Sequence, residues 1–367
     1  MKKHVLLLLG VVLFYCMNPA FSQEEELTEK ERAYRDSIAA LNQENAAIVA
    51  SQEAYNKGIE LFQQKQFKQA IASFKSSIAS DPNFTAAYYN KGIAENEANL
   101  YSEAAQTLTT LLEKDPEYSK AYFQRARAYQ GSNEYTKAEV DYKKSIELDP
   151  KNPNAYYNYG TLQFLQQEYD GAIASFTKTI ELKGNETYAY NDRGSCYRMK
   201  GDYNKAIADY EQAEKKNPNL AFVLNNIGTT KMKMKNYEGA IAAFNRAISI
   251  DKNFHLAYNN RGATQLERKR YDEAISDFEK CIAVRADYAP AWANVAAAKF
   301  RKEEYKEALK AVDKAIQLDK NYATAYVNRG MIREMLRDMN GACDDWEKAK
   351  ELGSEIGGKY NSQNCGF

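Results

Sequence analysis

The sequence predicts an all-α protein built from nine tandem helical hairpins. Three observations support this prediction: a 34-residue pattern recurs without insertion or deletion, its small and apolar residues are spaced three or four apart, and helix-breaking residues separate the periodic stretches. The nine copies cover residues 51–84, 85–118, 119–152, 153–186, 187–220, 221–254, 255–288, 289–322 and 323–356. Because each hairpin of such an array packs on its neighbours, we expect one elongated solenoid over residues 51–356 rather than separate domains.

The copy at residues 187–220 shows how one hairpin arises. Its first helix carries a stripe at spacings of four and three, formed by Tyr190, Gly194 and Tyr197. Its second helix carries a similar stripe, formed by Ala206, Tyr210 and Ala213. Gly201 breaks the first helix, and Pro218 lies where the second helix cannot continue. These features predict two helices whose small residues allow a close approach.

Two columns of small residues recur through all copies, counting the first residue of each copy as position one. Position eight is Gly58, Gly92, Ala126, Gly160, Gly194, Gly228, Gly262, Ala296 and Gly330. Position twenty is Ala70, Ala104, Ala138, Ala172, Ala206, Ala240, Ala274, Ala308 and Ala342. With aromatic residues at positions four, seventeen and twenty-four, these columns resemble the tetratricopeptide repeat. The resemblance implies a right-handed solenoid, with the aromatic columns in its core.

The resemblance also implies that positions two, five, six, nine and twelve of the first helices line a concave groove. Position five is aromatic at Tyr55, Tyr89, Phe123 and Tyr157, and then becomes Asn191, Asn225 and Asn259. Position six is nearly a ladder of amides: Asn56, Asn90, Gln124, Asn158, Asp192, Asn226, Asn260, Asn294 and Asn328. Position two adds apolar side chains at Tyr188, Phe222 and Leu256.

A row of Asn side chains offers donors and acceptors that suit the backbone of an extended peptide. We therefore expect an aromatic groove in the amino-terminal repeats and an amide-rich groove with apolar pockets in the carboxy-terminal ones. An alternative stays open, in which some of these Asn residues bond only to the adjacent repeat and bind no ligand.

Position seven departs from the family, which usually has Leu there. It carries Lys57, Lys91, Arg125, Arg193, Arg261 and Arg329. We expect these side chains to lay their stems along apolar surface and keep their charges in water, with an acidic or phosphate-bearing ligand as the alternative. The clamp by which co-chaperone members of the family hold a terminal carboxylate is not supported, because no repeat combines Lys at position five with Asn at position nine.

Residues 1–22 have the features of a secretory signal peptide. Lys2 and Lys3 precede an apolar run at 5–15, and Ala20-Phe21-Ser22 is a small-x-small cleavage motif. We predict cleavage after Ser22 and export to the periplasm or the outside of the cell. The apolar run is too short to span a bilayer, although an uncleaved anchor is an alternative. Lipidation at Cys16 is disfavoured because Tyr15 stands where a bacterial lipoprotein site has a small residue.

Residues 23–50 lie outside the repeat columns. Their apolar residues keep three-to-four spacing behind an acidic start: Leu27, Tyr34, Ile38, Leu41 and Ile48. This pattern predicts an amphipathic lead-in helix. We expect it to cap the open face of the first repeat, with a coiled-coil or partner-docking helix as the alternative.

Residues 357–367 are predicted to form a carboxy-terminal tail. Cys343 and Cys365 flank the helix-breaking stretches Gly353-Ser354 and Gly357-Gly358. In an oxidising compartment we predict a disulfide between them that pins the tail over the last repeat and contributes about 3 kcal/mol. The alternative is that Cys343, which lies in a column of Ile and Leu, is only a core residue.

The composition excludes several classes of function. The 50 Lys and Arg residues balance 50 Asp and Glu residues, so no basic field is present to attract nucleic acid. The two histidines, His4 and His255, leave little material for a His-based metal site or a Ser-His-Asp triad. No phosphate-binding loop, dinucleotide fingerprint or zincin motif occurs. We expect no enzyme activity, no metal and no cofactor.

The sequence therefore predicts a non-catalytic scaffold that binds a peptide or protein segment in the concave groove, within an envelope or secreted assembly. The alternative is a structural spacer that self-assembles by stacking through its terminal helices. The identity of the partner is not predicted. Self-association, and membrane association through a partner, both stay open.

Overall fold

The structure is a computed structural model that describes residues 29–365. The predicted signal peptide, its cleavage site after Ser22 and Cys16 lie outside these residues. In the described part of the chain, all regular structure is helical and amounts to 19 helices. The chain divides after Ser132 into two compact units.

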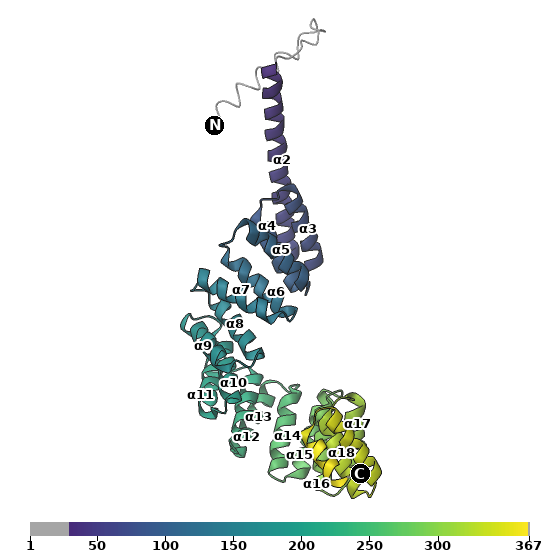
Figure 1. Ribbon diagram of the computed structural model, residues 1–367. Coiled ribbons are helices and arrows are strands. Elements are labelled where there is room, and N and C mark those ends of the chain that lie inside the picture. The colour runs from purple at the N-terminus through teal and green to yellow at the C-terminus, as the bar shows by residue number, and fades with distance from the viewer. Residues whose placement is uncertain (1–28, 366–367) are drawn as a thin grey trace. The chain divides into compact units, whose positions relative to one another are not determined.

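Figure 1 labels the helices. Unit 1 contains α2 (Glu29–Gln63), α3 (Phe67–Ser80), α4 (Thr85–Glu97), α5 (Tyr101–Lys114) and α6 (Ser119–Gly131). Unit 2 begins with α7 (Tyr135–Leu148), α8 (Pro153–Leu165), α9 (Tyr169–Glu181), α10 (Glu186–Met199), α11 (Tyr203–Lys216), α12 (Ala221–Lys233) and α13 (Tyr237–Ile250). It continues with α14 (His255–Glu267), α15 (Tyr271–Val284), α16 (Ala289–Arg301), α17 (Tyr305–Leu318), α18 (Ala323–Met335), α19 (Met339–Glu351) and α20 (Glu355–Asn364).

The turn between the two helices of each hairpin has a left-handed residue at position fifteen. Gly201 is the one glycine in this column, with φ of 83°. The other members also have positive φ: Lys65, Asn99, Asn133, Gln167, Lys235, Lys269, Glu303 and Arg337. A residue with a Cβ is disfavoured in this conformation by about 1 kcal/mol. The packing of the two helices, rather than local preference, therefore determines most of these turns.

A glycine column lets the two helices of a hairpin touch. A Cβ built on Gly228 would lie 2.5 Å from the ring of Phe244, and one on Gly262 would lie 2.8 Å from the ring of Phe278. The aromatic residues that enter these spaces at position twenty-four are fully buried: Phe74, Phe176, Tyr210, Phe244, Phe278 and Trp346. In these hairpins the core therefore lies between position eight of the first helix and position twenty-four of the second.

Within each unit, successive first helices contact one another. In unit 1, α4 contacts α6, and in unit 2 the contacts run from α8 to α10 and onward to α18 and α20. The second helices, such as α9 and α11, contact first helices but not each other. The first helices therefore approach each other more closely.

The lead-in segment differs from the prediction of a separate cap. Helix α2 runs without a break from Glu29 to Gln63, so the lead-in and the first helix of the first repeat are one helix (Figure 1). Its apolar residues before the first repeat are exposed: Tyr34, Ile38, Leu41, Ile48 and Val49. In the part of the chain that the structure describes, nothing covers this stripe. The segment therefore does not cap the first repeat.

The predicted carboxy-terminal tail is a helix. Gly353, with φ of 85°, ends α19, and the Ser354 hydroxyl accepts a hydrogen bond from the backbone N–H of Gly357 at the start of α20. Gly357 lies against Ala349, which explains why the glycines fall inside the helix instead of breaking it. The ring of Tyr360 stacks on Trp346 with centroids 5.2 Å apart.

A disulfide joins Cys343 on α19 to Cys365, the residue that follows α20. Helix α20 contacts both α18 and α19, so it occupies the place where the first helix of a further repeat would pack. The last hairpin is therefore covered by a helix that is also covalently attached to it.

No helix in the described range 29–365 combines the length and the apolar character needed to cross a membrane.

Candidate functional site

The predicted groove residues lie on the face shared by the first helices, which we call the first-helix face. It comprises positions two, five, six, nine and twelve of each repeat. In unit 2, three amide pairs connect successive repeats on this face. Asn226 donates to Asn191, Asn260 to Asn225, and Asn294 to Asn259, in each case from Nδ2 to Oδ1 at 2.9 Å. Position six of one repeat thus bonds to position five of the preceding one.

The position-five amides of these pairs are buried. Asn191, Asn225 and Asn259 have exposed fractions of 6%, 8% and 8%. Each accepts a hydrogen bond from the next repeat, as in the alternative that the sequence left open. These three amides therefore join repeats, and their acceptor oxygens are already engaged. The amide ladder fixes how each repeat sits on its neighbour.

In unit 1, tyrosines take the place of the buried amides. The Nδ2 of Asn90 donates to the hydroxyl of Tyr55 at 2.9 Å. The side chain of Gln124 hydrogen-bonds Tyr89, and burial raises the pKa of that phenol. Tyr89 also packs edge-on against Tyr118, with centroids 5.3 Å apart. The aromatic residues predicted for a groove here are thus half-buried and bonded to the next repeat.

Two other predicted groove residues lie outside these pairs. Phe123 is half-buried on α6 in unit 1. In unit 2, Asn158 donates from Nδ2 to the backbone oxygen of Asn154 at 2.9 Å, so it bonds within its own helix α8. The side chain of Asn158 therefore remains on the surface of the first-helix face.

Asp192 is the one carboxylate in the position-six column. Its Oδ2 accepts a hydrogen bond from the hydroxyl of Tyr157 at 2.7 Å, and its Oδ1 accepts one from Nδ2 of Asn191 at 2.9 Å. Burial raises the pKa of Asp192 because it penalises the charged form, and these two hydrogen bonds offset only part of the rise. Burial and the adjacent carboxylate also raise the pKa of Tyr157.

Beside Asp192 the surface is hollowed by a pocket of about 240 Å³ between α8 and α10. Its lining residues are Thr161, Phe164, Leu165, Phe176, Asp192 and Ser195. Three of them are apolar, two carry hydroxyl groups, and one is the carboxylate. This combination of apolar walls with a few polar groups is typical of ligand pockets.

Apolar side chains are exposed around this pocket. Leu165 lines it with an exposed fraction of 57%, and Met199, at the same repeat position on α10, is 49% exposed. Tyr188 is 43% exposed and stacks on Phe222, with centroids 5.9 Å apart. The predicted position-two residues of α10 and α12 therefore form an aromatic pair at the surface. A second pocket of about 340 Å³ lies farther along unit 2, lined in part by Phe300, Met331 and Tyr360.

The position-seven arginines do not keep their charges in water, and that expectation is wrong. In repeat seven, Nε and Nη2 of Arg261 donate to the two carboxylate oxygens of Asp277 at 2.8 and 2.6 Å. The exposed fractions of these two side chains are 17% and 6%. Nη1 reaches Oδ1 of Asn245 in the preceding repeat at 2.6 Å. The guanidinium thus clamps its own hairpin and the hairpin before it.

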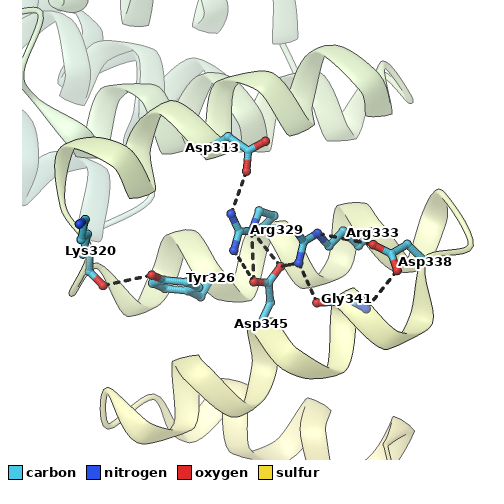
Figure 2. Close-up of polar contacts among 8 residues, drawn as sticks. All are labelled: Asp313, Lys320, Tyr326, Arg329, Arg333, Asp338, Gly341 and Asp345. Carbon is cyan, nitrogen blue, oxygen red and sulfur yellow. Dashed lines mark hydrogen bonds and ion pairs between the residues drawn. The ribbon is translucent and has the colours of Figure 1, made fainter.

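Figure 2 shows the same arrangement in the last repeat, where Arg329 lies between Asp345 of its own repeat and Asp313 of the preceding one. Repeat five has the same arrangement, in which Arg193 bonds Asp209 of its own repeat and Thr177 of the preceding one. The intervening repeats have apolar residues in both columns, Ile227 with Ala243 and Val295 with Ala311. The ion pairs could have been predicted from the sequence. From repeat five to repeat nine, Arg at position seven always occurs with Asp at position twenty-three, and an apolar residue at one position occurs with an apolar residue at the other.

The two free cysteines are buried small residues, Cys196 and Cys281. Burial raises the pKa of the Cys196 thiol to about 12 and that of Cys281 to about 11. Neither thiol is therefore ionised near neutral pH. In the described residues, no group of three His, Cys, Asp or Glu side chains could hold a metal ion.

We expect Asp192→Asn to stabilise the protein by about 1 kcal/mol at pH 7, since it removes a half-buried charge that has no cationic partner. The equivalent pair Asn90–Tyr55 shows that an amide can bond the tyrosine at this site. The folded-state pKa of Asp192 lies above its ordinary value of 3.8. The loss of folding stability that its charge causes in the parent therefore grows as pH rises through that folded-state pKa, and it is absent below 3.8. Urea denaturation of both proteins at pH 7 and at lower pH should show the gain shrinking on acidification. An equal gain at all pH values would contradict this.

Comparison with family models matches tetratricopeptide repeat models to residues 61–129, 119–152, 141–174, 187–220, 221–254, 255–288 and 289–322. Together these matches cover well over half of the chain. A search of the curated proteins found no match.

The solved structures that resemble the chain in fold include the following two. A tetratricopeptide repeat protein from Parabacteroides merdae ATCC 43184 aligns with a TM-score of 0.58 and 20% identity, covering 67% of this chain and 98% of its own. The APC/C hetero-tetramer Cut9–Hcn1 contains a chain that aligns with a TM-score of 0.54 and 19% identity, covering 85% of this chain. The present chain spans 60% of the length of that one. At these identities the likeness concerns the fold alone.

Proposed function

The chain belongs to the tetratricopeptide repeat family, and from this premise we propose that it is a non-catalytic scaffold that binds a peptide or an extended protein segment on its first-helix face. One observation carries the proposal: a pocket opens among residues of that face on α8 and α10, Leu165 at its edge is exposed, and Tyr188 and Met199 are exposed on the same helix α10. Apolar side chains that border a pocket are better suited to a partner than to water.

The amide ladder supports the same proposal in another way. The Tyr157–Asp192 contact joins α8 to α10 and the buried amides join the first helices that follow, so the exposed side chains are already positioned before a partner arrives. A rigid surface loses little conformational freedom on binding, so most of the ordering cost falls on the partner. An extended segment would cross several repeats and contact each one similarly.

A matched pair of triple variants tests the proposal. The face variant carries Leu165→Ser, Tyr188→Ser and Met199→Ser. The control variant carries Val140→Ser, Ile250→Ser and Val284→Ser, which remove three exposed apolar side chains from second helices of the same unit. Circular dichroism should first show that both variants fold like the parent.

The chain and both variants are then used as bait for crosslinking in envelope fractions, with mass spectrometry of the captured proteins. We expect the parent and the control to capture the same protein and the face variant to lose it. A synthetic peptide from the crosslinked region should then bind the purified parent. Capture that is equal for all three baits would contradict binding at this face.

A second candidate function is self-association through α2. Its exposed stripe follows the alternating four and three spacing of a coiled coil, at Tyr34, Ile38, Leu41, Asn45 and Ile48. A single polar residue in such a stripe, here Asn45, is compatible with a coiled coil and fixes its register. The partner would be α2 of a second copy. Sedimentation of the parent and of an Ile38→Glu, Leu41→Glu variant would test this, and a monomer at all concentrations for the parent would count against it.

We also propose that the protein is exported, on the basis of the signal-peptide pattern in residues 1–22. A disulfide between Cys343 and Cys365 suits an oxidising compartment. Amino-terminal sequencing of the protein from periplasmic and culture fractions should give a chain that begins at Gln23. An intact amino terminus in the cytoplasmic fraction would contradict export.

A further inference from the structure

Asp192 differs from its neighbours in the position-six column by a charge that the fold does not need. In the next two repeats, Asn226 and Asn260 make the corresponding contact with the preceding repeat as neutral amides. In unit 1, Asn90 makes it with a tyrosine, Tyr55, which is the residue type that Asp192 meets in Tyr157. An amide would therefore serve the structure at position 192 as well as the carboxylate does.

The charge of Asp192 is not neutralised inside the protein. Its two hydrogen-bond donors, Tyr157 and Asn191, are neutral, and no Lys or Arg of the described residues forms an ion pair with it. The guanidinium of Arg193, the next residue, is committed to Asp209 at 2.8 Å. Arg198, farther along α10, donates from Nε to the hydroxyl of Tyr210 at 3.4 Å.

A carboxylate that is partly removed from water and has no cationic partner lowers stability. Residues that lower stability and are not required by the fold are concentrated at functional sites. The free energy lost at Asp192 would be recovered if a cation from outside the protein entered the pocket. Each carboxylate oxygen has accepted one hydrogen bond and can accept another.

The pocket beside Asp192 is lined by groups that suit a long cationic side chain. Its apolar walls, from Phe164, Leu165 and Phe176, can pack against methylene groups, while the carboxylate receives the charged end. The hydroxyls of Thr161 and Ser195 also line it. A volume of about 240 Å³ is several times the share of one water molecule, which is about 30 Å³, so a side chain has room to enter.

We propose that this pocket receives one lysine or arginine side chain of the bound protein segment, with the ammonium or guanidinium paired to Asp192 and the methylene groups against Phe164 and Leu165. This inference rests on the proposed function and adds a specificity to it. The exposed apolar residues would contact any extended segment, whereas this pocket selects a basic residue at one position.

Four pools of blocked hexapeptides test the inference. Each pool carries a fluorophore and random residues, except that the third residue is fixed as Lys, Arg, norleucine or Glu. Norleucine keeps the methylene chain of Lys without its charge. Fluorescence anisotropy measures binding of each pool to three proteins: the full chain, Asp192→Asn, and the control Asp170→Asn.

The control removes the same charge at an exposed carboxylate of α9, where Asp170 pairs with Lys200. Thermal denaturation followed by circular dichroism should show that both variants fold. For the parent and for Asp170→Asn, we expect the Lys and Arg pools to bind about tenfold more tightly than the norleucine pool, and the Glu pool to bind most weakly. For Asp192→Asn, we expect the Lys and norleucine pools to bind equally.

The outcomes separate the inference from the function on which it rests. If all pools bind the parent equally and Asp192→Asn changes nothing, the cationic pocket is wrong while peptide binding stands. If the preference for Lys persists in Asp192→Asn, another acidic residue is responsible and the assignment to Asp192 is wrong. If no pool binds any of the three proteins, both the inference and the proposed peptide-binding function are contradicted.

Discussion

Replacing Arg261 by Ile is expected to lower the free energy of unfolding by about 3–5 kcal/mol, because Asp277 then stays buried with no cation beside it. Asp277 has an exposed fraction of 6% and receives two hydrogen bonds from Arg261. The substitution also removes the contact of the guanidinium with the ring of Tyr258, 5.6 Å from its centroid, and the hydrogen bond to Asn245. The damage should therefore reach the hairpin before it as well.

The double variant Arg261→Ile, Asp277→Ala should recover most of that loss. It copies the combination that repeat six already uses, Ile227 with Ala243, and it removes both buried charges together. Urea denaturation of the parent, of the single variants Arg261→Ile and Asp277→Ala, and of the double variant gives the coupling energy. Repeat arrays do not always unfold in one step. Amide exchange in α14 and α15, which carry Arg261 and Asp277, should therefore be measured together with the urea denaturation. A loss below about 1 kcal/mol for the single variant would mean that the pair behaves like a surface ion pair.

Trp346→Ala is expected to cost about 3–5 kcal/mol, since it empties a fully buried site in the last hairpin. The same substitution removes the ring on which Tyr360 of α20 stacks. Helix α20 should therefore lose protection from amide exchange, while the disulfide between Cys343 and Cys365 keeps it attached to α19. Adding a reductant should increase exchange in α20 further.

Trp346→Phe is the matched control, because Phe244 and Phe278 fill the same position in other repeats. It removes an indole N–H that is buried without a hydrogen-bond partner, so we expect a cost below about 1.5 kcal/mol. Amide exchange in α20 and thermal denaturation measure both variants. If Phe and Ala cost the same, the indole ring does not hold α20 in place.

The periodicity of the sequence was sufficient to predict the helical hairpins. Gly228 and Gly262 were correctly grouped with small residues that bring helices together, because a recurring column carries information that no single residue does. The ends of the array were less well predicted. Neither Gly nor Pro stands between Glu29 and Gly58, so the lead-in and the first repeat helix had no reason to separate. Ser354 is a good helix N-cap, and with it the tail becomes α20.

The candidate site was predicted only in part, because columns were interpreted one at a time. Asn191 and Asn226 are 35 residues apart and belong to different columns, yet they form one hydrogen bond. Arg261 and Asp277 are 16 residues apart on different helices, and neither column alone identifies the other as its partner. The sequence shows Asp192 as the one carboxylate in a column of amides. Its partial burial and the pocket beside it depend on the packing between α8 and α10, which the sequence does not give.

The alternation of Arg–Asp pairs with apolar pairs from repeat five to repeat nine implies that this part of unit 2 is composed of modules of two repeats, or 68 residues. Removing residues 187–254 would place repeat seven directly after repeat four. Arg261 would then lie beside Thr177, which now accepts a hydrogen bond from Arg193. Asn260 would lie beside Tyr157, in the arrangement in which Asn90 now donates a hydrogen bond to Tyr55. A chain of this kind can therefore change length by whole modules and keep its interfaces compatible, so the length of its first-helix face is adjustable without redesign of any single contact.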